Sequence, residues 1–179
     1  MDNIILYISG ERGLSVLKSL VASRHRVQRV ITPGLIATKF DYCGLCEQHN
    51  ISLNIVKDVN ADAYLRSLVL DGTPDIGIIC GFPTIFREHL INCPAFGTIN
   101  LHAGKLPEYR GGSPLNWQLI NGEKDITITV IQVDSGIDTG PILAEQKFSI
   151  SDQDDIADVH QKANGIFPVL VESVLDNIE

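Results

Sequence analysis

The sequence predicts an α/β fold: a Rossmann-like, doubly wound, mostly parallel sheet within a single domain spanning residues 1–179. Three observations predict it. Segments with strand and helix character alternate through the first 80 residues, which favours parallel strands joined by helices. The runs at 4–9 and 76–80 are almost continuously apolar, as strands buried on both faces are. The length of 179 residues is typical of one domain.

The first half reads as a βαβαβαβ series. Strands are expected at residues 4–9, 27–31, 51–56 and 76–80. Helices are expected at residues 14–21, 42–49 and 61–70, with turns at 10–13, 32–34 and 71–74. Ligands of such sheets bind beyond the carboxyl ends of the strands, so functional side chains are sought there.

The second half is richer in loops, and nothing in it marks a second domain. In order, we expect a strand at 97–102, a Gly- and Pro-containing loop at 103–113, a helix at 115–120, a strand at 126–133, a tight loop at 134–140 and a strand at 142–150. A final helix is expected from Asp152 onward, with one apolar face formed by Ile156, Val159, Ala163, Ile166 and Leu170. The apolar stretch 166–175 could pair two subunits as a homodimer, although packing on its own sheet is favoured.

Composition excludes several classes of protein. The formal net charge is −8 and no Lys/Arg cluster is present, which argues against nucleic-acid binding. No apolar run approaches the roughly 20 residues that span a bilayer, so a membrane protein is not expected. The N-terminus resembles a first strand rather than a signal peptide, which indicates a cytoplasmic location. The acidic charge does not exclude a phosphorylated small molecule as a ligand, because one helix N-terminus can hold a phosphate.

Four cysteines are present, two of them in a C-x-x-C at 43–46 that is followed by His49. A structural zinc site needs a second ligand pair, and none is found. We therefore expect Phe40, Cys43 and Cys46 to form the buried face of a helix, and we predict no metal site.

The first strand-to-helix turn contains Ser9, Gly10 and Arg12. It is not a G-x-G-x-x-G fingerprint, so a dinucleotide site is weakly supported. An ordinary strand-to-helix turn that contains glycine is favoured. A substrate phosphate on the helix N-terminus, near Arg12, stays open.

Two polar side chains, Asn100 and His102, end the expected strand at 97–102. Residues two apart on a strand project to the same side. An amide that can donate to an oxyanion, next to an imidazole that can move a proton, suits acyl transfer. Asp134 and Asp138 lie on the loop at 134–140, and either could supply the carboxylate that orients the imidazole.

From residue 74 to residue 150 the chain resembles the formyltransferases that use 10-formyltetrahydrofolate, a group with acceptors that include glycinamide ribonucleotide, initiator methionyl-tRNA, amino-sugar nucleotides and peptide-synthetase substrates. The first seventy residues match in pattern alone. The matching segments are Asn100-Leu101-His102, the stretch from Leu106-Pro107 to Gly111, Pro114 with Trp117, and the loop at 134–140.

The resemblance implies roles for individual residues. Asn100 binds the formyl oxygen, His102 acts as acid or base and supports the oxyanion, and Asp138 orients His102 and helps to take the proton from the amine. Residues implied to bind the folate co-substrate are Gly81, Phe82, Pro83, Ile85, Gly104, Lys105, Leu106, Pro107, Asp134, Gly136 and Gly140. Gly104 and Lys105 stand where the family pattern has serine and leucine; Lys105 either is a solvated loop residue or meets an anionic group.

The acceptor amine is expected to belong to an amino-sugar nucleotide. Acidic charge and an end after one helix disfavour tRNA, and the first turn is a poor version of the glycine-rich phosphate loop of glycinamide ribonucleotide enzymes. The expected substrate-binding residues are Ser9, Gly10, Arg12, Tyr109 and Arg110. Alternatives are glycinamide ribonucleotide, a carrier-bound amino acid, hydrolysis of 10-formyltetrahydrofolate, and a non-catalytic folate- or nucleotide-binding module.

Overall fold

A computed structural model describes residues 1–34, 40–61, 68 and 72–178. The chain forms two compact units, Met1–Ile99 and Asn100–Glu179, and each is described by itself. The helix expected at 61–70 falls almost entirely outside the described residues. Among the described residues, no helix combines the length and apolar character needed to cross a membrane.

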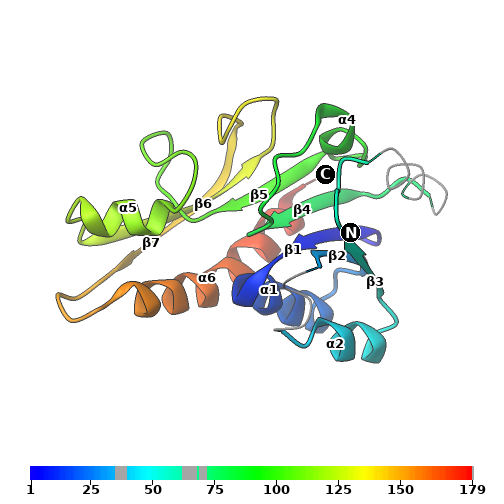
Figure 1. Cartoon of the computed structure of the whole chain (residues 1–179), viewed down its shortest axis with the longest axis horizontal. Helices are drawn as coiled ribbons and strands as arrows, with labels where there is room; N and C mark the ends of the chain where they lie inside the picture. Colours follow the sequence, from blue (N-terminus) through cyan, green and yellow to red (C-terminus); the bar gives the residue numbers. More distant parts are fainter. Residues whose placement is uncertain (35–39, 62–67, 69–71, 179) are drawn as a thin grey trace. The chain divides into compact units, whose positions relative to one another are not determined.

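The first unit is built on parallel strands in the order β3-β2-β1-β4, followed by the start of β5 (Figure 1). These strands are β1 (Ile4–Ile8), β2 (Val27–Pro33), β3 (Ser52–Val56) and β4 (Ile76–Cys80). β1 and β4 are buried along their whole length, as their continuous apolar character predicts. Their carboxyl ends meet where the main-chain nitrogen of Ser9 donates to the carbonyl oxygen of Cys80 over 3.1 Å.

Helix α1 (Gly10–Ala22) begins four residues earlier than predicted. The segment expected as a free turn is its first turn, which starts directly after Ser9 in extended conformation. Gly13 lets this turn approach β1 closely, since a Cβ on Gly13 would lie 2.6 Å from the Cβ of Ile8. The glycine is therefore required by helix–strand packing.

Helix α2 (Tyr42–Gln48) is capped by the carboxylate of Asp41, which accepts from the main-chain nitrogen of Gly44 over 2.9 Å. Its buried residues are Tyr42 and Cys46, whereas Cys43 is exposed. Of the expected buried face, only Cys46 is buried: Phe40 is half-buried and precedes the helix, and Cys43 is exposed because the helix turns its Tyr42 side inward. A one-turn helix that the sequence did not predict, α4 (Glu88–Ile91), follows β4.

The second unit contains the end of β5 (Thr98–His102), helix α5 (Pro114–Ile120), the hairpin of β6 (Asp125–Gln132) and β7 (Ile142–Ser149), and helix α6 (Ile156–Asn177). Strand order in this unit is β5-β6-β7, and β6 pairs with β7 in antiparallel register. The predicted mostly parallel α/β sheet is confirmed, and its β6–β7 pair is antiparallel.

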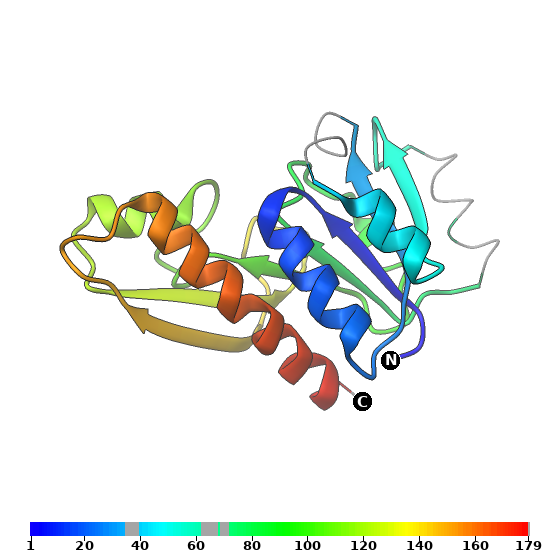
Figure 2. The same ribbon diagram turned by 90° about the horizontal axis from the view of Figure 1, so that it is seen from below.

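Helix α6 runs beside the β6–β7 hairpin (Figure 2). It begins at Ile156 rather than at Asp152, because Asp155 and Asp158 form a reciprocal capping box there. Its buried residues are Val159, Ala163, Asn164, Phe167, Pro168, Val171, Val174 and Leu175. Three residues assigned to the buried face from the sequence are only half-buried: Ile156, Ile166 and Leu170. The buried stripe continues instead at i+4 spacing through Phe167 and Val171.

Candidate functional site

The structure brings Asn100, His102 and Asp138 together within the second unit. Strand β5 presents Asn100 and His102, and the loop between β6 and β7 delivers Asp138. The Asn100 Nδ2 amide donates to Asp138 Oδ1 over 3.2 Å. His102 Nδ1 lies 3.4 Å from Asp138 Oδ2, with side chains 5% and 13% exposed. The result is an amide, an imidazole and a carboxylate in one sheltered cluster.

Main-chain and side-chain donors from the loop at 103–113 hold Asp138 in place. The main-chain nitrogen of Gly111 donates to Asp138 Oδ2 over 2.9 Å, and the Arg110 Nε donates to the carbonyl oxygen of Asp138 over 3.0 Å. Asp138 adopts φ +51°, a left-handed conformation that is uncommon outside glycine. Both its carboxylate oxygens are therefore directed by contacts to other parts of the unit.

Asp134, the other aspartate of this loop, has a different role. Its Oδ1 accepts from the main-chain nitrogen of Gly136 over 3.0 Å and from the Thr139 hydroxyl over 2.6 Å. Gly140 packs so closely that a Cβ there would lie 1.8 Å from the carbonyl oxygen of Gln132. Asp134 thus shapes the loop internally, while Asp138 faces Asn100 and His102.

Side-chain and main-chain contacts hold the loop at 103–113 in place. Lys105 and Glu108 form an exposed ion pair over 2.6 Å, and this contact raises the pKa of Lys105 and lowers that of Glu108. The Tyr109 hydroxyl donates to Glu123 over 2.7 Å, and the carbonyl oxygen of Tyr109 lies 2.6 Å from His102 Nε2. Tyr109 and Lys105, expected at ligand sites, therefore have protein partners within the unit.

Two buried polar residues that the sequence reasoning missed fix the backbone next to His102. Gln118 is 1% exposed; its Nε2 donates to the carbonyl oxygens of Ala103 and Thr127, each over 3.2 Å. Its Oε1 accepts from the main-chain nitrogen of Thr127 over 2.9 Å. The Thr129 hydroxyl donates to the carbonyl oxygen of Gly104 over 2.6 Å. The sequence feature that could have revealed this role is Gln118 itself, because a polar residue three positions after Leu115 lies on the buried face of α5.

In the first unit, the residues expected to bind a substrate phosphate lie at the carboxyl ends of β1 and β4. Gly10 has φ +71°, and the side chain of Ser9 makes no capping bond to α1. Burial lowers the pKa of the Arg12 guanidinium. A half-buried guanidinium therefore lies in the first turn of α1.

The segment expected to contact the pterin follows β4 in the same unit. Phe82 is half-buried against Tyr7 and Phe86, with ring centroids 6.1 and 5.6 Å away and near-perpendicular ring planes. Ile85 is 73% exposed, and its carbonyl oxygen accepts from Asn60 Nδ2 over 3.0 Å. Pro83 is exposed. The segment thus combines an anchored aromatic ring with exposed apolar surface.

Comparison with known proteins decides the family. A model of the formyl transferase family matches residues 21–167, which is most of the chain. The chain belongs to the formyl transferase family.

Its relatives in sequence include two methionyl-tRNA formyltransferases. That of Thermodesulfovibrio yellowstonii is 31% identical over 192 residues, covering 99% of this chain and 59% of the relative. That of Geobacter metallireducens is 31% identical over 173 residues, covering 95% of this chain and 52% of the relative. This formyl transferase chain therefore spans between half and three fifths of the length of these two relatives.

Solved structures share the fold at lower identity. A phosphoribosylglycinamide formyltransferase from Bacillus halodurans superposes with a TM-score of 0.79 at 20% identity, covering 100% of this chain and 97% of the other. A formyltetrahydrofolate deformylase from Pseudomonas syringae superposes with a TM-score of 0.81 at 22% identity, covering 97% of this chain and 59% of the other. These structures establish the formyl transferase fold for the chain.

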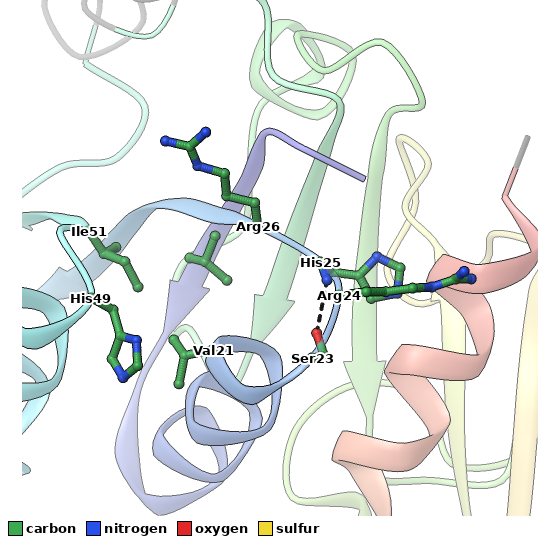
Figure 3. Close-up of a pocket in the computed structure, with 8 residues that line it drawn as sticks. Val21, Ser23, Arg24, His25, Arg26, His49 and Ile51 are labelled. Atoms are coloured by element: carbon green, nitrogen blue, oxygen red, sulfur yellow. Dashed lines mark hydrogen bonds between the residues drawn. The ribbon is translucent and has the colours of Figure 1, made fainter.

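A separate hollow of about 260 Å³ lies in the first unit of this formyl transferase, at the amino end of β2 (Figure 3). Arg24, His25, Arg26 and His49 are among its lining residues, but Figure 3 shows Arg24 and Arg26 pointing in different directions. Because ligands of α/β sheets bind at the opposite, carboxyl ends, this hollow is not the expected substrate site.

All four cysteines, Cys43, Cys46, Cys80 and Cys93, are free thiols. No group of three or more His, Cys, Asp or Glu residues in the described part of the chain could hold a metal ion. A hydrogen bond to Glu47 raises the pKa of exposed Cys43, and burial raises that of Cys46 to about 11 and that of Cys80 to about 12. Raised values leave little thiolate at neutral pH.

Proposed function

We propose that this formyl transferase moves a formyl group from 10-formyltetrahydrofolate to a primary amine. The observation that carries the proposal is the convergence of Asn100, His102 and Asp138, whose functional atoms lie 3.2 and 3.4 Å apart. An amide donor, an imidazole and a carboxylate are the groups that acyl transfer to an amine requires. Membership of the formyl transferase family supports the same reaction.

10-Formyltetrahydrofolate supplies an activated formyl group, and each unit, taken by itself, carries exposed apolar side chains of the kind that bind a ring system. In the first unit Ile85 is 73% exposed beside half-buried Phe82. In the second unit Ile137, on the loop that carries Asp138, is 57% exposed. The residues we assign to the folate are Gly81, Phe82, Pro83, Ile85, Gly104, Lys105, Leu106, Pro107, Asp134, Gly136 and Gly140.

Each member of the trio has one chemical task. One Asn100 Nδ2 hydrogen is directed to Asp138, which leaves the second to donate to the formyl oxygen as negative charge develops there. Asp138 accepts the proton that the amine loses when its nitrogen bonds to the formyl carbon. His102 returns a proton toward the departing folate nitrogen as the old C–N bond breaks, which balances the transfer.

For the acceptor we propose an amino-sugar nucleotide. The net charge of −8 favours a small ligand over a polyanionic one, because long phosphate backbones are held by clustered cations. In the first unit, Arg12 at the start of α1 is the cation we assign to the nucleotide phosphate, with Ser9 and Gly10. Tyr109 and Arg110 are assigned to the amine-bearing part.

A second acceptor, methionyl-tRNA, is favoured by one observation: the sequence relatives that cover most of this chain are methionyl-tRNA formyltransferases. Its binding here would be steeply salt-dependent, because a tRNA contact releases counterions. Binding of a small nucleotide-linked amine would depend on salt far less.

The experiment follows tetrahydrofolate release from 10-formyltetrahydrofolate with one acceptor at a time: amino-sugar nucleotides, methionyl-tRNA, glycinamide ribonucleotide, and water alone. We expect release that depends on an added amine and is largest with an amino-sugar nucleotide. Release of equal rate without any amine indicates a hydrolase. No release with any acceptor, together with retained folate binding, indicates a binding module and contradicts the proposal.

A further inference from the structure

Strand β7 forms the free end of the sheet in the second unit (Figure 2). Within the described residues it pairs with β6 alone. Six of its eight residues are exposed, and the other two, Ala144 and Phe148, are half-buried. An edge strand presents a row of unpaired main-chain N–H and C=O groups, which are a template for pairing with a second strand. The edge of β7 is therefore a surface that another strand can extend.

The main-chain groups of β7 point alternately toward β6 and away from it. The main-chain nitrogen of Ile150 donates to the carbonyl oxygen of Lys124 over 3.0 Å, and the register between the strands is then regular as far as residue 144. In an antiparallel ladder every second residue exchanges both main-chain hydrogen bonds with its partner. The even-numbered residues therefore face β6, whereas Glu145 and Lys147 direct their N–H and C=O groups outward.

Glu145 and Lys147 also carry opposite charges on one face of β7, because residues two apart on a strand project to the same side. Both side chains are exposed, and neither has an ion-pair partner within the described residues. Charged residues on an edge strand commonly discourage pairing with foreign strands. Here the two charges are spaced so that they complement each other when β7 meets a second copy of itself.

The charges select one register for such a pair. Outward main-chain groups must meet outward groups, so an antiparallel pair of β7 strands sets odd-numbered residues opposite odd-numbered residues. A two-fold axis at Glu145 or at Lys147 would set like charges directly opposite each other, which is destabilising. An axis at Gln146 sets Glu145 of each copy opposite Lys147 of the other, which gives two pairs of opposite charge.

The other face of β7 fits the same register. An axis at Gln146 sets Phe148 of each copy opposite Ala144 of the other, so a large half-buried ring meets a small side chain. Gln146 Nε2 donates to the outward carbonyl oxygen of Lys147 over 2.9 Å, in an exposed contact. This bond opens on pairing, and the main-chain nitrogen of Glu145 of the other copy replaces it.

We propose that two copies of this chain associate through β7: the strands pair antiparallel about Gln146, and Glu145 of each copy lies opposite Lys147 of the other. The β6–β7 hairpins of the two copies are thereby joined edge to edge. The catalytic trio does not lie on β7, so this inference is independent of the proposed function. We expect the rate of formyl transfer per chain to be the same in monomer and dimer.

This surface differs from the one that the sequence suggested for a homodimer, the apolar stretch of α6 at 166–175. The structure buries Phe167, Val171 and Val174 of that stretch, so these side chains are not available to a second copy. The self-complementary surface of the second unit is the edge of β7.

The test is sedimentation equilibrium of the full chain over a concentration series. We expect a reversible dimer, because a single strand pair is at the small end of specific interfaces. Glu145→Lys and Lys147→Glu each convert both opposite-charge pairs into like-charge pairs, so each should raise the dissociation constant at least about 10-fold. Glu88→Lys, an exposed acid on α4, makes the same change in net charge as Glu145→Lys and should leave the dissociation constant unchanged.

Mixing the two single variants tests the register itself. In a heterodimer of Glu145→Lys with Lys147→Glu, each lysine again faces a glutamate, so we expect the mixture to dimerise as the unsubstituted chain does. The double exchange Glu145→Lys/Lys147→Glu should also restore the dimer. Circular dichroism checks that each variant is folded, and Lys147→Gln, which removes the pairs without adding like charges, takes the place of a charge reversal that does not fold.

Three results overturn the inference. The first is an unsubstituted chain that stays monomeric up to about 1 mM, which leaves the edge to a strand of another protein. The second is a dimer that Glu145→Lys and Lys147→Glu weaken no more than Glu88→Lys does, which places the contact on another face. The third is a mixture of the two single variants that does not recover the dimer. Formyl transfer is measured on the same samples, and its absence counts against the proposed function alone.

Discussion

Asp138 Oδ2 lies 3.4 Å from His102 Nδ1, across a sheltered contact between the loop after β6 and the end of β5. The same carboxylate accepts from Asn100 and from the main-chain nitrogen of Gly111. One side chain therefore organises the amide, the imidazole and the neighbouring loop. This arrangement makes separate predictions for catalysis and for stability.

Replacing Asn100 with alanine should lower kcat by about 100- to 1,000-fold, because an amide donor to the developing oxyanion is lost. The fold should persist, since Asn100 is not fully buried. The matched control is Asn116→Ala, an exposed asparagine on α5, which should leave kcat unchanged. Steady-state kinetics of both variants checks the prediction, and equal kcat values would remove Asn100 from the mechanism.

Replacing Gln118 with leucine should lower the free energy of unfolding by at least about 2 kcal/mol, because it leaves buried main-chain groups of Ala103 and Thr127 without partners. Urea unfolding monitored by circular dichroism measures this as a lower midpoint at constant slope. Asn116→Leu, on the exposed face of the same helix, is the control. A midpoint for Gln118→Leu equal to that of the control would show that the buried amide does not stabilise the site.

Two glycines within helices should respond to alanine with opposite signs. Gly13→Ala should destabilise by about 1–3 kcal/mol, because the new methyl group would press on Ile8 of β1. Gly165→Ala, in α6, should stabilise by about 0.5–1 kcal/mol, since no atom lies within 4 Å of the added Cβ and alanine favours the helix. Denaturant midpoints check both, and shifts of the same sign would refute the packing argument for Gly13.

Cysteine reactivity should follow exposure and pKa. Iodoacetamide at neutral pH should label exposed Cys43 first, while Cys46 and Cys80 stay protected, because burial holds their pKa values near 11 and 12. Labelling of Cys43 should accelerate as pH rises, since its own raised pKa leaves little thiolate at neutral pH. Mass spectrometry of labelled peptides measures the order, with the urea-unfolded chain as reference. Equal rates for Cys43 and Cys80 in the folded protein would contradict the structure.

Much of the fold follows from the sequence, because periodicity reports burial. The apolar runs that became β1 and β4 predicted fully buried strands. The first residues of α1 and α6 were predicted less accurately, because they depend on specific contacts. In α1 the first turn packs with Gly13 against Ile8, and α6 begins at the cap formed by Asp155 and Asp158. Local pattern carries little information about such contacts.

The site was predictable as a set of residues but not as an arrangement. Strand alternation placed Asn100 and His102 on one side, yet nothing local distinguished Asp134 from Asp138. The distinction comes from loop geometry, in which Asp134 bonds to Gly136 and Thr139 and so leaves Asp138 to face the strand. The supporting bonds from Gln118 to the backbone at Ala103 are likewise set by tertiary packing alone.

The most direct test of the central claim is the single-turnover rate of formyl transfer by Asp138→Asn. Asparagine keeps the size and tolerates the left-handed backbone of this residue, but it cannot take the amine proton. Glu145→Gln, an exposed acid on β7, is the control for charge. The account predicts a rate at least about 100-fold below that of the unsubstituted protein for Asp138→Asn, and an unchanged rate for Glu145→Gln. A folded Asp138→Asn protein that transfers the formyl group at the original rate would contradict it.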